Sequence, residues 1–390
     1  MTSSNPSYQL RWVNRMDELP QADWDRLAKP LETPFLEWFW LSSMETSGST
    51  VAQAGWLPNH LTAWRDDRLV AAAPLYLKGH SRGEFVFDHQ WADLAEQLGI
   101  EYYPKLLGMS PFTPAEGYRF LVAPEENEAA LTAAMVAAID QFCDRNQISG
   151  CHFLYTDPAW RSQLEDLGFH KWLHHSYVWK NEGYSSFDDY LARFNANQRR
   201  NIKRERKSVA KAGLAFKIHT GDGLSDGLCN LVYDFYCDTC DKFGWWGSKY
   251  LTRQFFQQLH PEFCDRTVVF AAYADGSDDP VGMSFCITKN DRLYGRYWGA
   301  FEDYNHLHFN ACYYEPIEWA IGQGIRLFDP GAGGRHKKRR GFPAEPNYSL
   351  HKFYHPMLGK ILDDYIDRIN AAEQQEIDAI NADLPLKPLA

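Results

Sequence analysis

The sequence lacks the features that mark a membrane, secreted or disordered protein. No window of its 390 residues approaches the ~18–20 uninterrupted apolar residues of a membrane-spanning helix. The N-terminal segment has no basic start followed by an apolar stretch, so it does not resemble a secretory signal. We therefore expect a protein without a membrane span that is located in the cytoplasm.

Cysteine is sparse, with eight residues in the chain. Cys237 and Cys240 form a C-x-x-C pair, and no second pair follows at the spacing of a zinc ribbon. The pair lies in a segment with a helical pattern, 224–243. We expect buried thiols on a helix and no metal cofactor; a metal or redox site is the less favoured alternative.

An excess of positive charge is also missing. Lys plus Arg number 40 against 51 Asp plus Glu, which gives a net charge of −11. This acidity argues against a general binder of nucleic acid or anionic membranes, but it leaves room for local basic patches. Aromatic side chains, in contrast, are abundant at 15% of the residues, and such side chains fill cores and line ligand clefts.

The predicted elements follow one plan in two halves of the chain, which is long enough for two domains. Each half has antiparallel strands, then a long amphipathic helix, then a buried strand. The matching segments are 60–78 and 267–299, 126–146 and 308–324, and 150–154 and 325–329. The predicted boundaries give domains over 1–175 and 176–360, and a polar helix and tail over 361–390.

This order of elements resembles the GNAT acyltransferase fold, present twice. The strings YYPKLLGMSPFTPAEG, LYGRYWG, HFNACYYEPIEWAIGQG and FDPGAGGRHKKRRGF, among others over about residues 30–360, resemble the bacterial FemAB-like family. The resemblance implies an α/β (α+β) fold of two tandem GNAT domains, with mixed, mostly antiparallel sheets flanked by helices. It also implies transfer of an acyl or aminoacyl group to an amine, such as that of a peptidoglycan precursor.

The donor implied by the resemblance is aminoacyl-tRNA or acyl-coenzyme A, so tRNA is a candidate partner. Two alternatives stay open. One is a coenzyme A-dependent N-acyltransferase of a small metabolite. The other is a non-catalytic protein that binds a peptidoglycan fragment or RNA. The sequence leaves the oligomeric state open.

Donors of this kind are anionic, and the first basic run, 193–211, offers matching charge. It holds eight Lys and Arg residues against one acid, Glu205. On a helix, four of the cations share one face by their i, i+3, i+4, i+7 spacing. The candidate donor-binding residues in this run are Arg199, Arg200, Lys203 and Arg204. The alternative is a solvated helix face.

The second basic run, FDPGAGGRHKKRRGF over 328–342, follows a predicted buried strand. Its glycines allow positive φ, and backbone N–H groups there could hold an anion. From this run we select His336 and Lys337 as catalytic candidates. Gly333, Gly334, Arg335 and Arg340 are the donor-binding candidates. The run is not a P-loop, and the Q/R-x-x-G-x-G/A motif for coenzyme A is absent.

The strand LYGRYWG, 293–299, provides two more catalytic candidates, Arg296 and Tyr297. Strand alternation predicts that Tyr294, Arg296 and Trp298 share one face. An arginine there is either a structural ion pair or a clamp for a substrate anion. Tyr297 is either a proton donor to the leaving group or a core tyrosine.

The first half contributes an aromatic stretch that suits the wall of an acceptor pocket between the two halves. The acceptor-binding candidates are Asp88, Trp91, Tyr103, Lys105 and Arg119. No Ser–His–Asp order can be assembled, so we expect direct attack in a ternary complex rather than a covalent acyl-enzyme.

Overall fold

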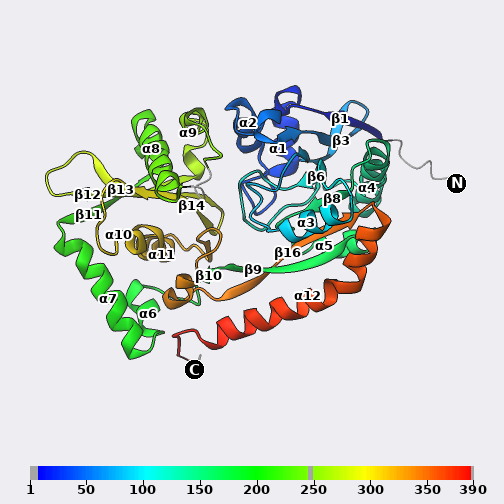
Figure 1. Cartoon of the computed structure of the whole chain (residues 1–390). Helices are drawn as coiled ribbons and strands as arrows, with labels where there is room; N and C mark the ends of the chain where they lie inside the picture. Colours follow the sequence, from blue (N-terminus) through cyan, green and yellow to red (C-terminus); the bar gives the residue numbers. More distant parts are fainter. Residues whose placement is uncertain (1–7, 245–248, 388–390) are drawn as a thin grey trace. The chain divides into compact units, whose positions relative to one another are not determined.

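The computed structural model describes residues 8–244 and 249–387, and its chain forms two compact units. Unit 1 comprises 1–174 and 347–374, and unit 2 comprises 175–346 and 375–390. Both are α/β in architecture (Figure 1). The elements that contribute residues to both units are β9 (His170–Tyr177), β16 (Ala344–Phe353) and α12 (Pro356–Ala382).

Unit 1 holds the N-terminal elements. Its helices are η1 (Met16–Glu18), α1 (Gln21–Ala28), α2 (Trp38–Thr46), η2 (Ala52–Ala54), α3 (His89–Gln97), α4 (Glu128–Arg145) and α5 (Arg161–Glu165). Its strands are β1 (Gln9–Val13), β2 (Trp56–Pro58), β3 (His60–Arg65), β4 (Arg68–Ala73), β5 (Tyr76–Lys78), β6 (Lys105–Gly108), β7 (Leu121–Val122) and β8 (Gly150–Phe153).

These strands form two sheets. The first has the order β1-β3-β4-β7 and is antiparallel throughout. The second has the order β2-β5-β6-β8-β16-β9, with a parallel pair at β6 and β8. The predicted strand pair over 60–78 is therefore divided, because Pro74 separates β4 from β5 and each joins a different sheet.

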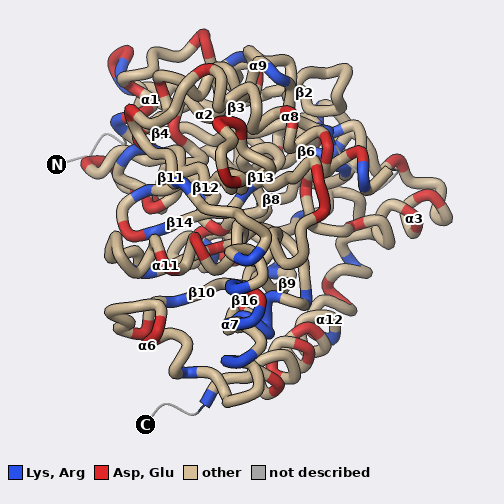
Figure 2. The backbone as a smooth tube through the Cα atoms, turned by 90° about the vertical axis from the view of Figure 1, so that its left-hand side faces the viewer, with Lys and Arg blue, Asp and Glu red and all other residues tan. Residues whose placement is uncertain are grey.

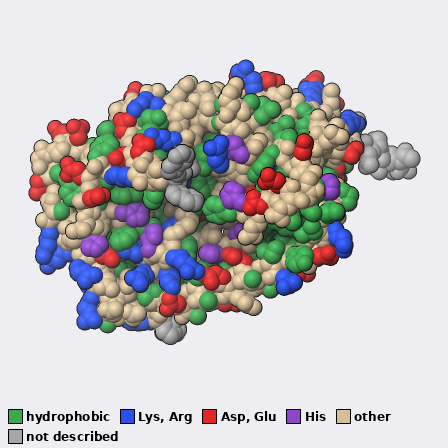
Figure 3. Space-filling view, viewed as in Figure 1, with side chains coloured by type: hydrophobic (Ala, Val, Ile, Leu, Met, Phe, Trp, Pro, Cys, Tyr) green, Lys and Arg blue, Asp and Glu red, His purple; other side chains and the backbone are tan. Residues whose placement is uncertain are grey.

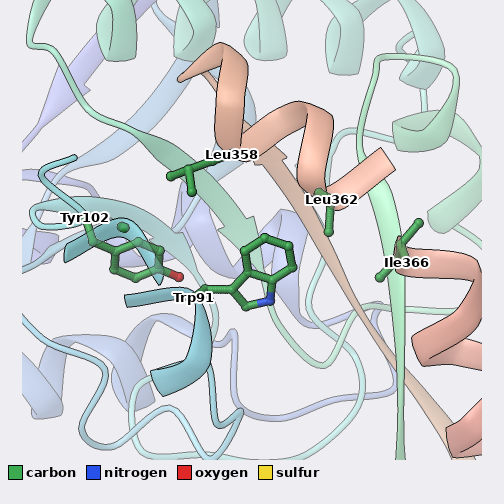
Figure 4. Packing of buried hydrophobic residues seen from close by; sticks show 6 residues of the cluster. Trp91, Tyr102, Leu358, Leu362 and Ile366 are labelled. Carbon is green, nitrogen blue, oxygen red and sulfur yellow. The ribbon is translucent and has the colours of Figure 1, made fainter. Parts of the chain in front are cut away.

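The C-terminal helix α12 packs on unit 1. Its buried Leu358, Leu362 and Ile366 contact a cluster that contains Trp91 and Tyr102 (Figure 4). The polar helix predicted over 361–390 therefore has a buried apolar side, which includes Leu362 and Ile366. The apolar residues recur every four positions, which places them on one side of the helix.

Unit 2 holds the remaining elements. Its helices are α6 (Phe187–Ala192), α7 (Ala196–Lys211), η3 (Gly221–Gly223), α8 (Asp226–Lys242), α9 (Arg253–Gln258), η5 (Cys264–Arg266), α10 (Leu307–Phe309), the π-helical η6 (Asn310–Tyr314), α11 (Glu315–Gly322) and η7 (Arg335–Arg340). Its strands are β10 (Trp179–Lys180), β11 (Leu214–Thr220), β12 (Thr267–Ala274), β13 (Pro280–Lys289), β14 (Arg292–Ala300) and β15 (Leu327–Asp329).

The unit 2 strands form one sheet in the order β10-β15-β14-β13-β12-β11. Its pairs are antiparallel except for β14 and β15, which run parallel. Helix α8 lies close to β14, where the backbone of Phe235 approaches Gly299 so closely that a Cβ there would sit 2.1 Å from the Phe235 carbonyl oxygen. Both units thus contain mixed, mostly antiparallel sheets, as the resemblance implies.

No helix among the described residues is long and apolar enough to cross a membrane.

Candidate active site

The parallel pair β14–β15 ends abruptly, and this positions the site in unit 2. Strand β15 pairs with β14 up to Asp329, opposite Tyr294, and the chain then turns at Pro330. Strand β14 continues for several residues without that neighbour. Side chains and backbone of its second half are therefore left facing a hollow rather than another strand.

A β-bulge shapes the same part of β14. Phe285 of β13 pairs with Tyr297, whereas the next residue, Cys286, pairs with Gly295, so Arg296 is the extra residue. The predicted regular alternation along 293–299 is therefore wrong. A bulge redirects the side chains that follow it. As a result Arg296 and Tyr297 both line the hollow.

The hollow is a cavity of about 270 Å³ within unit 2. Its walls come from α8, β13, β14, the α10–η6 helix and the loop that precedes η7. The structure brings together here all four predicted catalytic residues and two predicted donor-binding glycines: Arg296, Tyr297, His336, Lys337, Gly333 and Gly334.

Lys337 is deeply buried, with 3% of its surface exposed. Its Nζ donates to the carbonyl oxygens of Gly331 at 2.5 Å and Ala332 at 3.3 Å. Burial lowers the pKa of this ammonium to about 8, although Asp329 acts in the opposite direction. Lys337 thus holds the glycine-rich loop in place through these hydrogen bonds. Its ammonium can also lose a proton near neutral pH.

The loop residues Ala332, Gly333 and Gly334 line the cavity. Gly333 and Gly334 have φ of +66° and +87°, which glycine adopts without strain. The N–H groups of Ala332, Gly333 and Gly334 donate to no other described residue. Lys337 holds the carbonyl oxygens of the peptide units that carry the N–H groups of Ala332 and Gly333. All three N–H groups are available to an anion or an oxyanion.

Two histidines flank the loop. The Nε2 atom of His336 lies 2.8 Å from the hydroxyl of Tyr313, and its ring centre lies 5.7 Å from that of His308. Burial, Arg340 and Lys337 lower the pKa of His336 to about 4. Burial and the neighbouring His336 lower that of His308 to about 3. Both imidazoles are therefore neutral at pH 7, which makes them weak bases in the free protein.

Two thiols also line the cavity. Burial raises the pKa of Cys286 to about 12 and places that of Cys312 well above its ordinary value. Both stay protonated at neutral pH and are poor nucleophiles. Cys237 and Cys240 lie on α8, as predicted, but they are half-buried and not buried as expected. Within 8–244 and 249–387, no group of three or more His, Cys, Asp and Glu side chains could hold a metal ion.

Arg340 is not among the residues that line the cavity, and it is 3% exposed. Its Nη2 donates to Glu205 at 3.1 Å and its Nη1 to the carbonyl of His336 at 3.0 Å. Its guanidinium also lies over the ring of Phe309. Arg335, in contrast, is exposed and pairs with Glu376. Neither residue lines the cavity with the other predicted donor-binding residues of this loop.

Helix α7 carries most of the first basic run, and blue segments mark its Lys and Arg residues in Figure 2. Asn195 caps its first turn by accepting from the N–H of Gln198 at 2.9 Å. The buried stripe of the helix consists of Gln198, Ile202, Glu205 and Val209. The Lys and Arg residues of the helix lie outside this stripe and point outward, as the predicted basic face requires. Blue side chains gather along the lower left of Figure 3 over α7.

Most of these cations lack an acidic partner. Arg206 is an exception, because it pairs with Glu315 at 3.2 Å and with Glu318. Among the described residues, no ion pair forms with the other cations of the helix, which are Arg199, Arg200, Lys203, Arg204, Lys207 and Lys211. We call these six residues the α7 basic face.

The acceptor-binding candidates of unit 1 are all engaged by neighbours within that unit. Lys105 is 1% exposed and its Nζ donates to Glu84 at 2.7 Å and to Asp88. Trp91 belongs to the cluster under α12. The hydroxyl of Tyr103 lies 2.7 Å from that of Ser81, and Arg119 pairs with Glu128 and with Asp157. Their role in binding an acceptor stays a prediction.

Sequence reasoning missed two groups that organise the site. Asp329 is buried and accepts from the N–H of Gly331 at 2.8 Å, so it sets the start of the loop. Glu205 anchors Arg340. The sequence does contain a signal for Glu205. A single acid among eight cations is a candidate for a buried ion-pair partner of an arginine or lysine.

Comparison with known proteins decides the family. The model of the FemAB-like family, described as peptidoglycan biosynthesis/recognition, matches residues 15–388. The chain belongs to the FemAB-like family. The family predicted from the sequence is therefore confirmed, and so is a mixed α/β fold with mostly antiparallel sheets.

Two solved structures resemble the FemAB-like chain over most of its length. FemX shares 10% sequence identity with a TM-score of 0.55, covering 90% of this chain and 99% of FemX. L-PGS from Bacillus licheniformis shares 9% identity with a TM-score of 0.54, covering 91% of this chain and 98% of its own. At this identity the likeness establishes the fold. No curated protein sequence matches the chain.

Proposed function

We propose that this FemAB-like transferase moves an acyl or aminoacyl group from an activated carrier to an amine, and that the transfer takes place in the unit 2 cavity. The observation that carries the proposal is the convergence of Arg296, Tyr297, His336 and Lys337 on one hollow where β14 and β15 part. The family description supports a peptidoglycan precursor as the source of the acceptor amine.

The reaction is a direct displacement. The acceptor nitrogen attacks the donor carbonyl carbon and a C–N bond forms. The C–O bond of an aminoacyl-tRNA ester, or the C–S bond of a coenzyme A thioester, breaks. One proton leaves the attacking nitrogen and one reaches the departing oxygen or sulfur. The high pKa values of the two lining thiols support this route over an acyl-cysteine intermediate.

Roles follow from the chemistry of the cavity walls. Lys337 exchanges the amine proton, because its pKa of about 8 lies nearest to neutrality among the cavity's histidines, thiols, lysine and Tyr297. Arg296 and the N–H groups of Gly333 and Gly334 stabilise the oxyanion. Burial raises the pKa of Tyr297, so this hydroxyl stays protonated and can donate to the leaving group.

The carrier of the acyl group is anionic, and the α7 basic face is its proposed docking surface. Six cations without ion pairs on a 16-residue helix repel one another, and a polyphosphate would relieve that repulsion. Both aminoacyl-tRNA and acyl-coenzyme A carry such phosphates. Action in the cytoplasm is part of the same proposal.

A transfer assay tests the function. The purified chain is incubated with radiolabelled acetyl-coenzyme A or alanyl-tRNA and a peptidoglycan precursor peptide with a free lysine amine. We expect an amide product that survives mild base. Lys337→Met should lower the rate by about 10²-fold or more. The matched control is Lys338→Met, because Lys338 pairs with Asp383 at 2.5 Å outside the cavity.

Two results would contradict the proposal. Equal rates for wild type and Lys337→Met would remove the unit 2 cavity as the site of transfer. Tight retention of a donor or a precursor without any turnover would instead support the alternative of a non-catalytic binding protein.

A further inference from the structure

The segment that carries Lys337 is a short 3-10 helix, η7, which has little stability of its own. The hydrogen-bond geometry of a 3-10 helix is poor, so such helices are short. Five of the six residues of η7 are Lys or Arg, and their like charges repel one another. Contacts from other elements must therefore hold η7 in place.

Helices α6 and α7 supply those contacts at the C-terminal end of η7. The hydroxyl of Tyr190 on α6 donates to the carbonyl of Arg340 at 2.5 Å. The side-chain amide of Gln198 on α7 donates to the carbonyl of Arg339 at 2.7 Å. The backbone at the end of η7 is thus tied to two helices of unit 2.

The guanidinium of Arg340 extends this hold to the peptide unit that precedes Lys337. Its Nη2 lies 3.1 Å from Oε2 of Glu205 on α7, and its Nη1 donates to the carbonyl of His336 at 3.0 Å. The N–H of the same peptide unit, which belongs to Lys337, donates to the carbonyl of Gly334 at 3.0 Å. The peptide unit between His336 and Lys337 is therefore held on both sides.

The side chain of Lys337 starts from this peptide unit. Its Nζ donates to the carbonyl oxygens of Gly331 and Ala332, at the end of a flexible four-carbon stem. A small rotation of the peptide unit is enlarged at the end of such a stem. Because a misplacement of about 1 Å can cost about 10²-fold in rate, the position of the peptide unit matters for any proton transfer by Lys337.

We propose that Arg340 is a positioning residue for Lys337, because its guanidinium ties the peptide unit that precedes Lys337 to Glu205 on α7. This inference rests on the proposed function, in which Lys337 exchanges the proton of the acceptor amine. The role differs from the donor binding predicted from the sequence. It requires arginine, since the planar fork presents its two Nη atoms to two acceptors at once, whereas the ammonium of lysine is a single point of charge.

The conservative variant Arg340→Lys separates positioning from charge pairing. Lysine keeps a positive charge opposite Glu205, so the urea midpoint should stay close to that of the wild type. Without the fork the carbonyl of His336 loses its donor, and kcat should fall by about tenfold or more, while the KM for the donor stays within about twofold. The matched control is Arg326→Lys, because this exposed arginine pairs with Asp291 at 2.6 Å outside the cavity.

A second measurement follows the Lys337 ammonium without any substrate. Lysine side chains labelled with ¹³C and ¹⁵N are titrated by NMR, and the Lys337 signal is assigned by its loss in Lys337→Met. Its pKa of about 8 should rise toward 10.5 in Arg340→Lys, because a side chain that is no longer held is better solvated. Gln198→Ala removes the contact with Arg339 and should change kcat and this pKa in the same directions by smaller amounts.

The outcomes distinguish the inference from the proposed function. Wild-type kcat and an unchanged pKa of Lys337 in Arg340→Lys would overturn the inference and leave the proposed function standing. A fall in kcat that matches the fraction of unfolded protein, with Gln198→Ala at wild-type values, would also overturn it. Absence of transfer by the wild type would overturn the proposed function, whereas a raised pKa of Lys337 in Arg340→Lys would still support its positioning by Arg340.

Discussion

Glu205 and Arg340 form a buried ion pair between α7 and η7, with the Arg340 Nη2 atom 3.1 Å from Oε2 of Glu205. Glu205 is the sole acid of the basic run 193–211 and is 8% exposed, and it also accepts from the hydroxyl of Tyr314. The pair therefore joins the basic helix to the segment that carries His336 and Lys337.

Removing this acid should destabilise unit 2. Glu205→Ala leaves the guanidinium of Arg340 buried without its counter-charge, which we expect to cost about 3–5 kcal/mol in the free energy of unfolding. Urea denaturation followed by tryptophan fluorescence measures the loss. The control is Glu376→Ala, which breaks the exposed pair with Arg335 and should cost about 0–1 kcal/mol. Similar losses of stability for the two variants would contradict the inference that the Glu205–Arg340 pair is a buried, stabilising contact.

The lowered pKa of Lys337 predicts how activity depends on pH. If the neutral amine takes the acceptor proton, kcat/KM should rise with pH and level off above about 8. A rate profile between pH 6 and 9.5 measures this, with propionyl- or acetyl-coenzyme A as donor at fixed ionic strength. A profile that is flat across this range would remove Lys337 as the group that exchanges the proton.

The same group predicts a pH dependence of stability. The folded-state pKa of Lys337, about 8, lies below the ordinary 10.5, so the unfolded chain binds more protons between these values. Wild type should therefore gain stability relative to Lys337→Met as pH rises from 8 to 10.5, by about 3 kcal/mol in total. Urea denaturation of both proteins at several pH values measures the difference, and a constant difference would contradict the shift.

The sequence allowed the local features of the site to be predicted, because helical spacing depends on near neighbours. The outward direction of Arg200, Lys203 and Lys207 on α7 follows from such spacing. The bulge at Arg296 does not, since it is set by the register between two strands. Lys337 and Arg340 carry the same charge three residues apart, yet one lines the cavity and the other does not; their partners come from distant segments that a linear pattern cannot locate.

The α7 basic face predicts salt-dependent binding of a polyanion. Lys203→Ala with Lys207→Ala should weaken binding of fluorescein-labelled tRNA and lower the slope of log K against log salt by about 2, one for each lost contact. Fluorescence anisotropy at several NaCl concentrations measures the slope. Lys360→Ala, on α12, is the control because its exposed side chain pairs with Asp364. An unchanged slope in the double variant would exclude α7 as the docking surface.

A substitution of Lys105 distinguishes a structural role of this residue in unit 1 from its predicted role in binding the acceptor. Its Nζ contacts Ser81, Glu84 and Asp88, all of them buried. Lys105→Met leaves two carboxylates without this counter-charge and should cost about 3–5 kcal/mol of stability. Thermal and urea denaturation measure this cost. A variant that keeps wild-type stability but has a raised KM for the acceptor would instead support the predicted acceptor role.

Replacement of glycine by alanine should have opposite effects on stability at two positions. Gly299→Ala would place Cβ 2.1 Å from the carbonyl oxygen of Phe235, so α8 and β14 must separate, at a cost of about 1–3 kcal/mol or more. Gly322→Ala, at the last residue of α11, meets nothing within 4 Å and should stabilise the protein by about 0.5–1 kcal/mol. Denaturation curves of both variants test the close approach, and a neutral Gly299→Ala would refute it.

The bulge in β14 makes the site depend on chain length as well as on residue identity. Removing one residue beside Arg296 would restore a two-residue repeat and turn its guanidinium away from the hollow. The side chains beyond that point would keep their sides of the sheet, because Tyr297 and the residues after it would keep their partners on β13. A single-codon deletion here would therefore change the lining of the cavity while it leaves the pairing of β13 with β14 intact.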